Sequence, residues 1–363
     1  MKNDKINIYE KISKRNYGID LLRIFSMINI INLHINLCSG LLLLKPNSLK
    51  FKGVWRSEIF SYCAVNCFGL ISGIVGYQHY NFSNLIYLWF LLCFYSTISS
   101  TYLYIKNLIT KKSLILSFFP LLIRKHWYFN AYFSMYLFIP FINEGIKNLD
   151  RKTYRNIVLF MIGFFSFYNI IATIFSEKDY NFLLNGYSSL WLIILYIIGG
   201  YFGKYLFQSK NYFNKNMFIY FLIYIISSFF TSEIKFKLLQ MKSNYSELFV
   251  SYISPTILLQ AISLVIFASR LNIKNKILIK FISFFTPLTF GILPIHWFFF
   301  NKINIMKSIY SWLNTIKNNL VFFNLYGLSI LFYFIFAFID YFRFQLFKII
   351  KIKELILFIK KKF

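Results

Sequence analysis

Long apolar runs with few charged residues recur along the whole chain of 363 residues. Runs of about 20 residues have the length that an α-helix needs to cross the hydrocarbon core of a bilayer. Backbone polar groups in that core must be hydrogen-bonded within the protein, which favours helices for such runs. We therefore predict an all-α fold, a polytopic membrane helix bundle with about ten transmembrane helices.

The predicted spans follow one another with short loops, so they form one transmembrane domain over residues 1–340. A basic, amphipathic cytoplasmic tail is expected over 341–363, lying on the membrane surface. The apolar run 113–123 is too short to span and is predicted to be interfacial or re-entrant. The ten expected spans are 18–42, 55–77, 84–105, 127–146, 156–176, 187–207, 217–232, 248–269, 281–301 and 320–340.

The formal net charge of +28 would indicate a nucleic-acid partner in a soluble protein. In a chain with 58% hydrophobic residues, lysines in loops are better explained by contact with anionic membrane lipids, and we expect no nucleic-acid partner. The predicted inner segments carry more Lys and Arg than the outer ones, which predicts that both termini are cytoplasmic. All four cysteines lie in predicted spans, and the pair Cys63 and Cys67, one helical turn apart, has no histidine or carboxylate nearby, so we expect free thiols and no metal site.

The first predicted span contains two ionisable residues, Arg23 and His34. They are eleven positions apart, which at about 100° per residue places them on the same helix face, roughly 16 Å apart along the axis. Ionisable side chains at this depth commonly line a cavity or path. We predict a membrane-embedded reaction site with His34 as its general base. The structural alternatives are a hydrogen-bonded neutral imidazole and a snorkelling arginine.

Three further polar residues are candidates for a supporting role. Asp20 lies one turn before the arginine and can hold its guanidinium. Glu58 is one of the few acids near a span, and we expect it to orient a histidine. Ser72 is a candidate for lining a substrate, although its neighbours Gly69 and Gly73 form a small-residue pair that close helix packing also explains.

Two histidines and a tryptophan complete the candidate set. His126 and Trp127 open the fourth predicted span, where aromatic residues also occur as an interfacial belt. His296 lies in a span that contains Pro287 and Pro294, and a broken helix can free backbone carbonyls for a site. We predict supporting roles for His126, Trp127 and His296.

Five motifs follow one another along nearly the whole chain, and in this order they resemble the acyltransferase 3 family of bacterial membrane O-acyltransferases. They are Ile19-Asp20-Leu21-Leu22-Arg23 with His34; Phe68-Gly69-Leu70-Ile71-Ser72-Gly73; Trp127-Tyr128-Phe129-Asn130-Ala131-Tyr132 through Leu137 and Pro140; Gly186-Tyr187-Ser188-Ser189-Leu190-Trp191 with Leu195-Tyr196-Ile197-Ile198-Gly199-Gly200-Tyr201; and Phe290-Gly291-Ile292-Leu293-Pro294-Ile295-His296.

The resemblance implies transfer of an acyl group, usually acetyl, from cytoplasmic acetyl-CoA to a hydroxyl of a cell-surface polysaccharide or its lipid-linked precursor. It also implies a location in the bacterial cytoplasmic (inner) membrane. Arg23 and His34 would be the essential pair: His34 would activate the hydroxyl or relay the acetyl group, and Arg23 would help to position the donor. The expected partners are a glycan or lipid-linked glycan and membrane lipids, with acetyl-CoA as a substrate and no metal.

One departure from the family pattern concerns the donor. After the second-span signature the family usually carries lysines or arginines attributed to binding of the CoA phosphates, whereas residues 77–84 contain none. His79 and Lys204 are therefore the candidate cofactor-binding residues, together with the basic loops 151–155 and 270–280.

Two other classes of membrane protein stay open from the sequence. A glycan flippase or polymerase would also be multi-span and basic, but it calls for a cationic cavity, and Arg23 is nearly the only cation well inside an apolar run. A proton-coupled transporter could use His34 and His296 as a relay.

Overall fold

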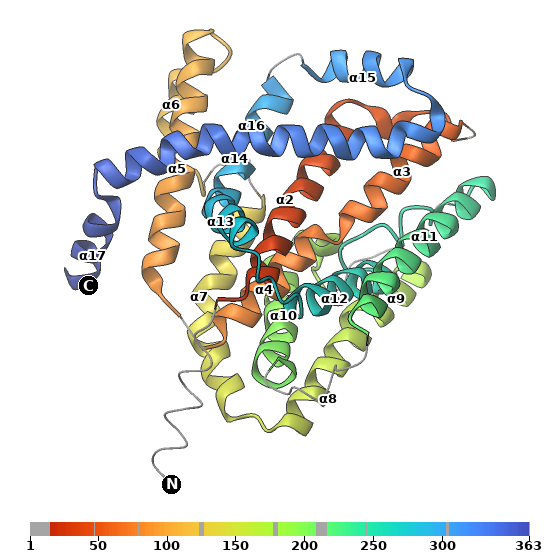
Figure 1. Ribbon diagram of the computed structural model, residues 1–363, viewed down its shortest axis with the longest axis horizontal. Helices are drawn as coiled ribbons and strands as arrows, with labels where there is room; N and C mark the ends of the chain where they lie inside the picture. The colour runs from red at the N-terminus through yellow and green to blue at the C-terminus, as the bar shows by residue number, and fades with distance from the viewer. Residues whose placement is uncertain are drawn as a thin grey trace.

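The computed structural model describes residues 15–46, 48–78, 80–122, 127–176, 181–207, 216–243, 245–302 and 305–362. Within these ranges the chain is a bundle of helices joined by turns and short loops, and it contains no β-strand (Figure 1). The predicted all-α fold class is confirmed.

Sixteen α-helices follow along the described chain, with short 3₁₀ and π segments between some of them. The first eight are α2 (Tyr17–Cys38), α3 (Leu49–Tyr62), α4 (Ala64–Gly76), α5 (Phe82–Ile105), α6 (Lys111–Leu116), α7 (Trp127–Asn148), α8 (Arg151–Ile162) and α9 (Asn169–Ser176). The second eight are α10 (Ser189–Tyr201), α11 (Phe218–Gln240), α12 (Pro255–Ser269), α13 (Lys276–Phe285), α14 (Thr289–Lys302), α15 (Ile305–Thr315), α16 (Val321–Ile349) and α17 (Ile352–Lys362).

Seven helical stretches of the described chain are long and apolar enough to cross a membrane. Two further apolar stretches are shorter, namely α10 with its extension to Tyr205, and α12. Helices occupy all ten expected ranges, but the count of about ten spans is not confirmed. The seven are Tyr17–Cys38, Leu49–Gly76, Phe82–Ile105, Arg151–Phe175, Phe218–Gln240, Lys276–Asn301 and Asn318–Ile349.

The boundary expected at residue 340 falls inside a helix. α16 continues to Ile349, and the chain then turns at Lys351, whose φ is +55°, before α17 begins. The helix continues because Asp340 and Arg343, which could have marked the start of a surface tail, are buried and form an ion pair. The apolar run 113–123 lies partly in the short helix α6 and the turns after it.

Helix α2 runs through the middle of the bundle, between α3, α4, α12, α13, α14 and α16 (Figure 1). Its first turn is capped by Asn16, whose side-chain oxygen accepts a hydrogen bond from the backbone N–H of Ile19 at 3.1 Å. The Asn16 amide also donates to the carbonyl of Ser269 at the end of α12. The cap therefore fixes both the start of α2 and its position against α12.

Helices α4 and α10 pack with their backbones in close contact. A Cβ added at Gly73 would lie 2.0 Å from the carbonyl oxygen of Tyr196, and one at Gly199 would lie 2.1 Å from the carbonyl oxygen of Leu70. Such contacts need glycine, which confirms the packing role expected for Gly73.

Side-chain amides hold α2 against α3 and α16. Asn32 donates to the carbonyl of Ser57 at 3.0 Å and to the hydroxyl of Ser61 at 2.9 Å, and it accepts from Ser329 at 3.2 Å. Asn36 donates to the Ser57 hydroxyl at 3.1 Å. All five residues are buried, so this network fixes the rotation of α2 and with it the direction of the remaining polar side chains.

Candidate functional site

Two histidines meet where α2 contacts α14. Nδ1 of His34 lies 3.0 Å from Nε2 of His296, and the ring centroids are 4.7 Å apart. Trp297 packs edge-on against the His34 ring at 5.3 Å. His296 is fully buried, whereas His34 is partly exposed and lines a cavity. The structure thus brings together the predicted base, His34, and His296, for which we predicted a supporting role.

The hydrogen bonds of this pair indicate where its protons lie. Nδ1 of His34 is 2.9 Å from the carbonyl oxygen of Ile30, and Nδ1 of His296 is 3.0 Å from that of Ile292. A carbonyl oxygen only accepts, so we assign a hydrogen to each Nδ1. Nε2 of His296 then accepts from His34, and Nε2 of His34 keeps its lone pair. In this tautomer His34 can act as a base, and His296 stabilises the cation that forms.

The histidine cavity, as we name it, has a volume of about 340 Å³ and extends along the Cys38 end of α2. Its wall combines two carboxylates with seven aromatic rings. The described lining residues are Ile30, Leu33, His34, Leu37, Leu42, Trp55, Glu58, Tyr62, Val65, Trp127, Tyr128, Tyr187, Glu247, Val250, Tyr252, Leu293 and Trp297.

Glu58 lies on the wall of this cavity with only 6% of its surface exposed. Its Oε2 accepts a hydrogen bond from Asn36 at 2.9 Å, and Asn36 lies two positions after His34 on α2. The Asn36 amide therefore holds the Glu58 side chain on the wall of the cavity that His34 also lines. Glu58 bonds this amide, whereas we had expected it to orient a histidine.

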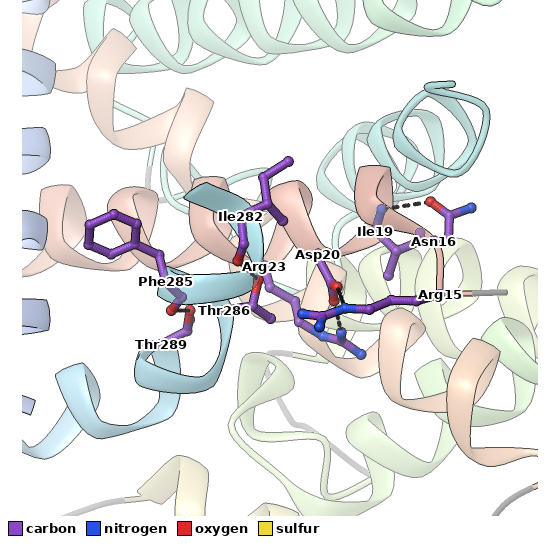
Figure 2. Close-up of polar contacts among 9 residues, drawn as sticks. All are labelled: Arg15, Asn16, Ile19, Asp20, Arg23, Ile282, Phe285, Thr286 and Thr289. Atoms are coloured by element: carbon purple, nitrogen blue, oxygen red, sulfur yellow. Dashed lines mark hydrogen bonds and ion pairs between the residues drawn. The ribbon is translucent and has the colours of Figure 1, made fainter. Parts of the chain in front are cut away.

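Arg23 lies nearer the start of α2, where Asp20 holds it. Asp20 accepts hydrogen bonds from Arg23 and, at 2.5 Å, from Arg15, so one nearly buried carboxylate lies between two guanidinium groups (Figure 2). The predicted pairing of Asp20 with Arg23 is confirmed. Two cations and one anion leave an excess positive charge at this end of the helix.

The arginine cavity, our name for a second cavity of about 190 Å³, begins at Arg23. Ser72 lines it as the sequence suggested, and its hydroxyl donates to the carbonyl of Phe68 at 2.8 Å. Burial raises the pKa of the Tyr80 hydroxyl, which stays protonated at neutral pH and can donate a hydrogen bond. The described lining residues are Arg23, Phe68, Ile71, Ser72, Val75, Gly76, Tyr80, Asn84, Tyr132, Tyr136, Ile139 and Phe290.

Four aromatic rings lie between the two cavities. Phe68 contacts Tyr128 at 6.5 Å and Phe290 at 5.8 Å, and Tyr132 contacts both Tyr128 and Phe290 at about 6 Å. Tyr128 lines the histidine cavity, while the other three line the arginine cavity. We call these four rings the aromatic partition. The predicted common face of Arg23 and His34 therefore borders two cavities that meet at this partition.

The other predicted residues are placed as follows. Trp127 lines the histidine cavity, in contact with Tyr187 and Tyr252. Nζ of Lys204 donates to three carbonyls at the end of α7, those of Ile146, Lys147 and Leu149. His79 and His126 lie outside the described residues.

Sequence reasoning missed the part of the histidine cavity wall that comes from the loop after α11, and the α11 lysine that pairs with this loop. Lys235 is fully buried, with its Nζ 2.5 Å from a carboxylate oxygen of Glu247 and 3.5 Å from the centre of the Trp55 ring. The lysine lies three positions beyond the expected span 217–232, between Ile234 and Phe236, so the expected boundary placed it outside the membrane. Among the described residues, no group of three or more His, Cys, Asp or Glu is arranged to hold a metal ion.

Comparison with known families gives a match over most of the chain. The family described as "Acyltransferase domain" matches residues 16–338, a range that contains both cavities and both histidines. Neither the curated proteins nor the solved structures gave a match.

Proposed function

Because the chain belongs to the acyltransferase 3 family, we propose that this acyltransferase is an O-acetyltransferase of the bacterial cytoplasmic membrane. In this proposal it moves an acetyl group from cytoplasmic acetyl-CoA to a hydroxyl of a cell-surface polysaccharide or its lipid-linked precursor. With both termini in the cytoplasm, the arginine cavity belongs to the cytoplasmic half and the histidine cavity to the outer half.

The histidine pair carries this proposal. A hydroxyl is a poor nucleophile until a base removes its proton, and Nε2 of His34 is the unprotonated nitrogen in the assigned tautomer. The proton passes from the hydroxyl to this nitrogen while the oxygen attacks the thioester carbonyl. The new C–O bond forms, the C–S bond breaks, and the CoA thiolate leaves and takes up the proton from His34. Nε2 of His296 accepts the hydrogen bond from Nδ1 of His34 and so keeps the His34 ring in its orientation throughout.

The arginine cavity supports a site for the donor. Acetyl-CoA is anionic, and the group of Arg15, Asp20 and Arg23 has an excess positive charge. Arg23 and His34 are roughly 16 Å apart along α2 at about 1.5 Å per residue, so a donor bound at Arg23 reaches the base only through an extended arm. That arm has to pass the aromatic partition, whose rings contact one another. The candidate phosphate ligands Lys204 and His79 stay predictions.

Two measurements test the proposed function. In cells, mass spectrometry of the surface glycans with and without the gene should show loss of one acetyl mass per modified sugar, restored by the wild type and not by His34→Ala. In nanodiscs, the purified protein should transfer radiolabelled acetyl from acetyl-CoA to glycan. Glycans of unchanged mass, together with no CoA release in vitro, would contradict the proposal. If His34 instead relays the acetyl group, its Nε2 carries the acetyl group before the sugar does. Rapid-quench mass spectrometry would then detect acetylated His34.

A further inference from the structure

The aromatic rings among the described lining residues of the histidine cavity all belong to tyrosine or tryptophan. They are Trp55, Tyr62, Trp127, Tyr128, Tyr187, Tyr252 and Trp297. Phenylalanine is the commonest aromatic residue of the chain, with 47 Phe against 28 Tyr and 6 Trp, so composition alone does not account for this selection. Tyrosine and tryptophan add a hydrogen-bonding group to a flat apolar ring. The wall therefore suits a ligand that has both apolar faces and hydroxyl groups.

Four of these rings form one continuous group, which we call the Tyr252 cluster. Trp127 stacks on Tyr252 with ring centroids 6.0 Å apart, and Tyr187 contacts both rings, at 4.6 and 4.9 Å. Tyr62 contacts Tyr252 at 4.8 Å. Tyr252 is buried, whereas Tyr187 is 41% exposed. The cluster therefore extends from the interior of the cavity to the surface of the protein, where a ligand can reach it.

The backbone fixes the cluster before any ligand binds. The N–H of Tyr252 donates to the carbonyl of Asn185 at 3.2 Å, and its carbonyl accepts from the Asn66 amide at 2.8 Å. Gly186 has a φ of +94°, and a Cβ added there would lie 2.4 Å from Cβ of Tyr252, so this close approach requires glycine. The turn at Gly186 also brings Tyr187 beside Tyr252. Such preorganisation lowers the entropic cost of binding a ligand.

A sugar ring matches the surface of the cavity. The C–H bonds of a pyranose form apolar faces that pack on aromatic rings, and the hydroxyl groups around its edge bond to the polar groups of tyrosine and tryptophan. A volume of about 340 Å³ lies at the small end for ligand sites, which suits a single ring. An acyl chain offers no partner to these polar groups, so a lipid tail fits the wall less well.

We propose, resting on the proposed function, that the Tyr252 cluster binds the acceptor as a single pyranose ring stacked by its C–H face. The bound ring then presents one hydroxyl to Nε2 of His34, which lines the same cavity. An open-chain polyol with the same hydroxyl groups has no fixed C–H face and loses more rotational freedom on binding. The cluster therefore determines specificity for a ring-shaped acceptor.

The experiment uses matched pairs of probes that differ in whether the sugar ring is closed. The closed probes are the methyl β-glycosides of glucose, galactose and N-acetylglucosamine, and the open probe of each pair is the alditol of the same sugar. Acetyl transfer and release of CoA are measured with the full-length protein in nanodiscs. For the best-accepted pair we expect kcat/KM of the glycoside to exceed that of its alditol at least about tenfold.

Variants of Tyr187 test the cluster at its exposed end, where a substitution disturbs folding least. Tyr187→Leu should raise KM for the best glycoside about tenfold, with kcat and KM for acetyl-CoA unchanged. Tyr187→Phe keeps the ring face and loses the hydroxyl, so its KM should lie between those of wild type and Tyr187→Leu. A purely structural role would lower the amount of folded enzyme, and hence kcat, without a selective effect on KM for the glycoside.

Tyr104→Leu is the matched control. Tyr104 is 40% exposed, close to the value for Tyr187, and it lines neither cavity. This variant should leave kcat and both KM values at the wild-type level.

The outcomes distinguish this inference from the proposed function. Equal kcat/KM for glycoside and alditol in every pair would overturn the inference while leaving acetyl transfer intact, and so would an unchanged KM for the glycoside in Tyr187→Leu. CoA release without transfer to any probe would also overturn it, because the cavity would then accept water and not a sugar ring. Absence of CoA release from a folded wild-type protein would instead count against the proposed function.

Discussion

Nδ1 of His34 and Nε2 of His296 face each other at 3.0 Å across the contact between α2 and α14. The two nitrogens share one proton, and two backbone carbonyls fix the orientation of both rings. The base therefore depends on a partner from the other end of the sequence. Substitution of that partner should affect the chemical step and leave substrate binding largely unchanged.

We expect His296→Ala to lower kcat by about 10²-fold or more with little change in KM for either substrate, because a positioned base contributes about 10²–10⁴-fold. The His34 imidazolium would lose the acceptor at its Nδ1. The measurement is the initial rate of acetyl transfer in nanodiscs at saturating acetyl-CoA. His296→Gln, which offers an acceptor oxygen, should recover part of the rate. A purely structural role would reduce folding of both variants alike and give no such recovery.

Asp20→Asn should raise KM for acetyl-CoA and change kcat little. The substitution removes the anion that orients Arg15 and Arg23, so the guanidinium groups separate and the donor loses a preformed site (Figure 2). Initial rates against acetyl-CoA concentration give both constants. Glu144→Gln is the control, because Glu144 forms an exposed pair with Lys147 outside either cavity. An unchanged KM for the donor would show that Asp20 does not position it.

Opening the aromatic partition should allow acetyl-CoA to be hydrolysed without acetylation of a sugar. Phe290→Ala removes a ring that contacts both Phe68 and Tyr132, and so joins the two cavities. We expect acetyl-CoA hydrolysis in the absence of a sugar to rise several-fold, because water reaches the thioester together with the base. The readout is the ratio of CoA released to sugar acetylated. If this ratio stays at the wild-type value, the partition does not separate the sites.

The buried pair of Asp340 and Arg343 should determine stability and not catalysis. Both side chains are almost fully buried, and Tyr95 and Tyr87 supply further hydrogen bonds. Breaking such a pair from one side typically costs about 3–5 kcal/mol. Asp340→Ala should therefore lower the midpoint of thermal unfolding in nanodiscs by several degrees while leaving kcat near wild type at low temperature. A variant that melts normally but lacks activity would contradict this assignment.

Gly291 packs against the carboxylate of Asp340. A Cβ added there would lie 1.9 Å from Oδ1 of Asp340, so Gly291→Ala has to displace the ion pair or α14. We expect a loss of thermal stability comparable with that of Asp340→Ala, and the double variant should be less destabilised than the sum of the two. Full additivity in the thermal midpoints would contradict a shared cause.

Much of the fold could be predicted because apolar length and helix periodicity are local properties. Each of the ten expected ranges contains a helix, and Arg23 and His34 line cavities. The number of spans could not be predicted in the same way, because short apolar helices such as α10 and α12 fall below the length of a full crossing.

The site was predictable only where single residues stood out from their surroundings. His34, Arg23 and Asp20 are polar residues within an apolar run, and the sequence indicates them directly. The contact of His34 with His296, and that of Lys235 with Glu247 and Trp55, depend on how distant helices pack. No spacing within the chain encodes these pairs. The continuation of α16 to Ile349 likewise depends on packing, because the burial of Asp340 and Arg343 is a tertiary property.

The most direct test of the central claim is the rate of acetyl transfer by His34→Ala compared with wild type, in the same nanodiscs and at matched thermal stability. Our account predicts a loss of at least about 10²-fold in kcat, because the variant has no base to remove the hydroxyl proton. Transfer at or near the wild-type rate would contradict it and would require the chemistry to lie elsewhere in the chain.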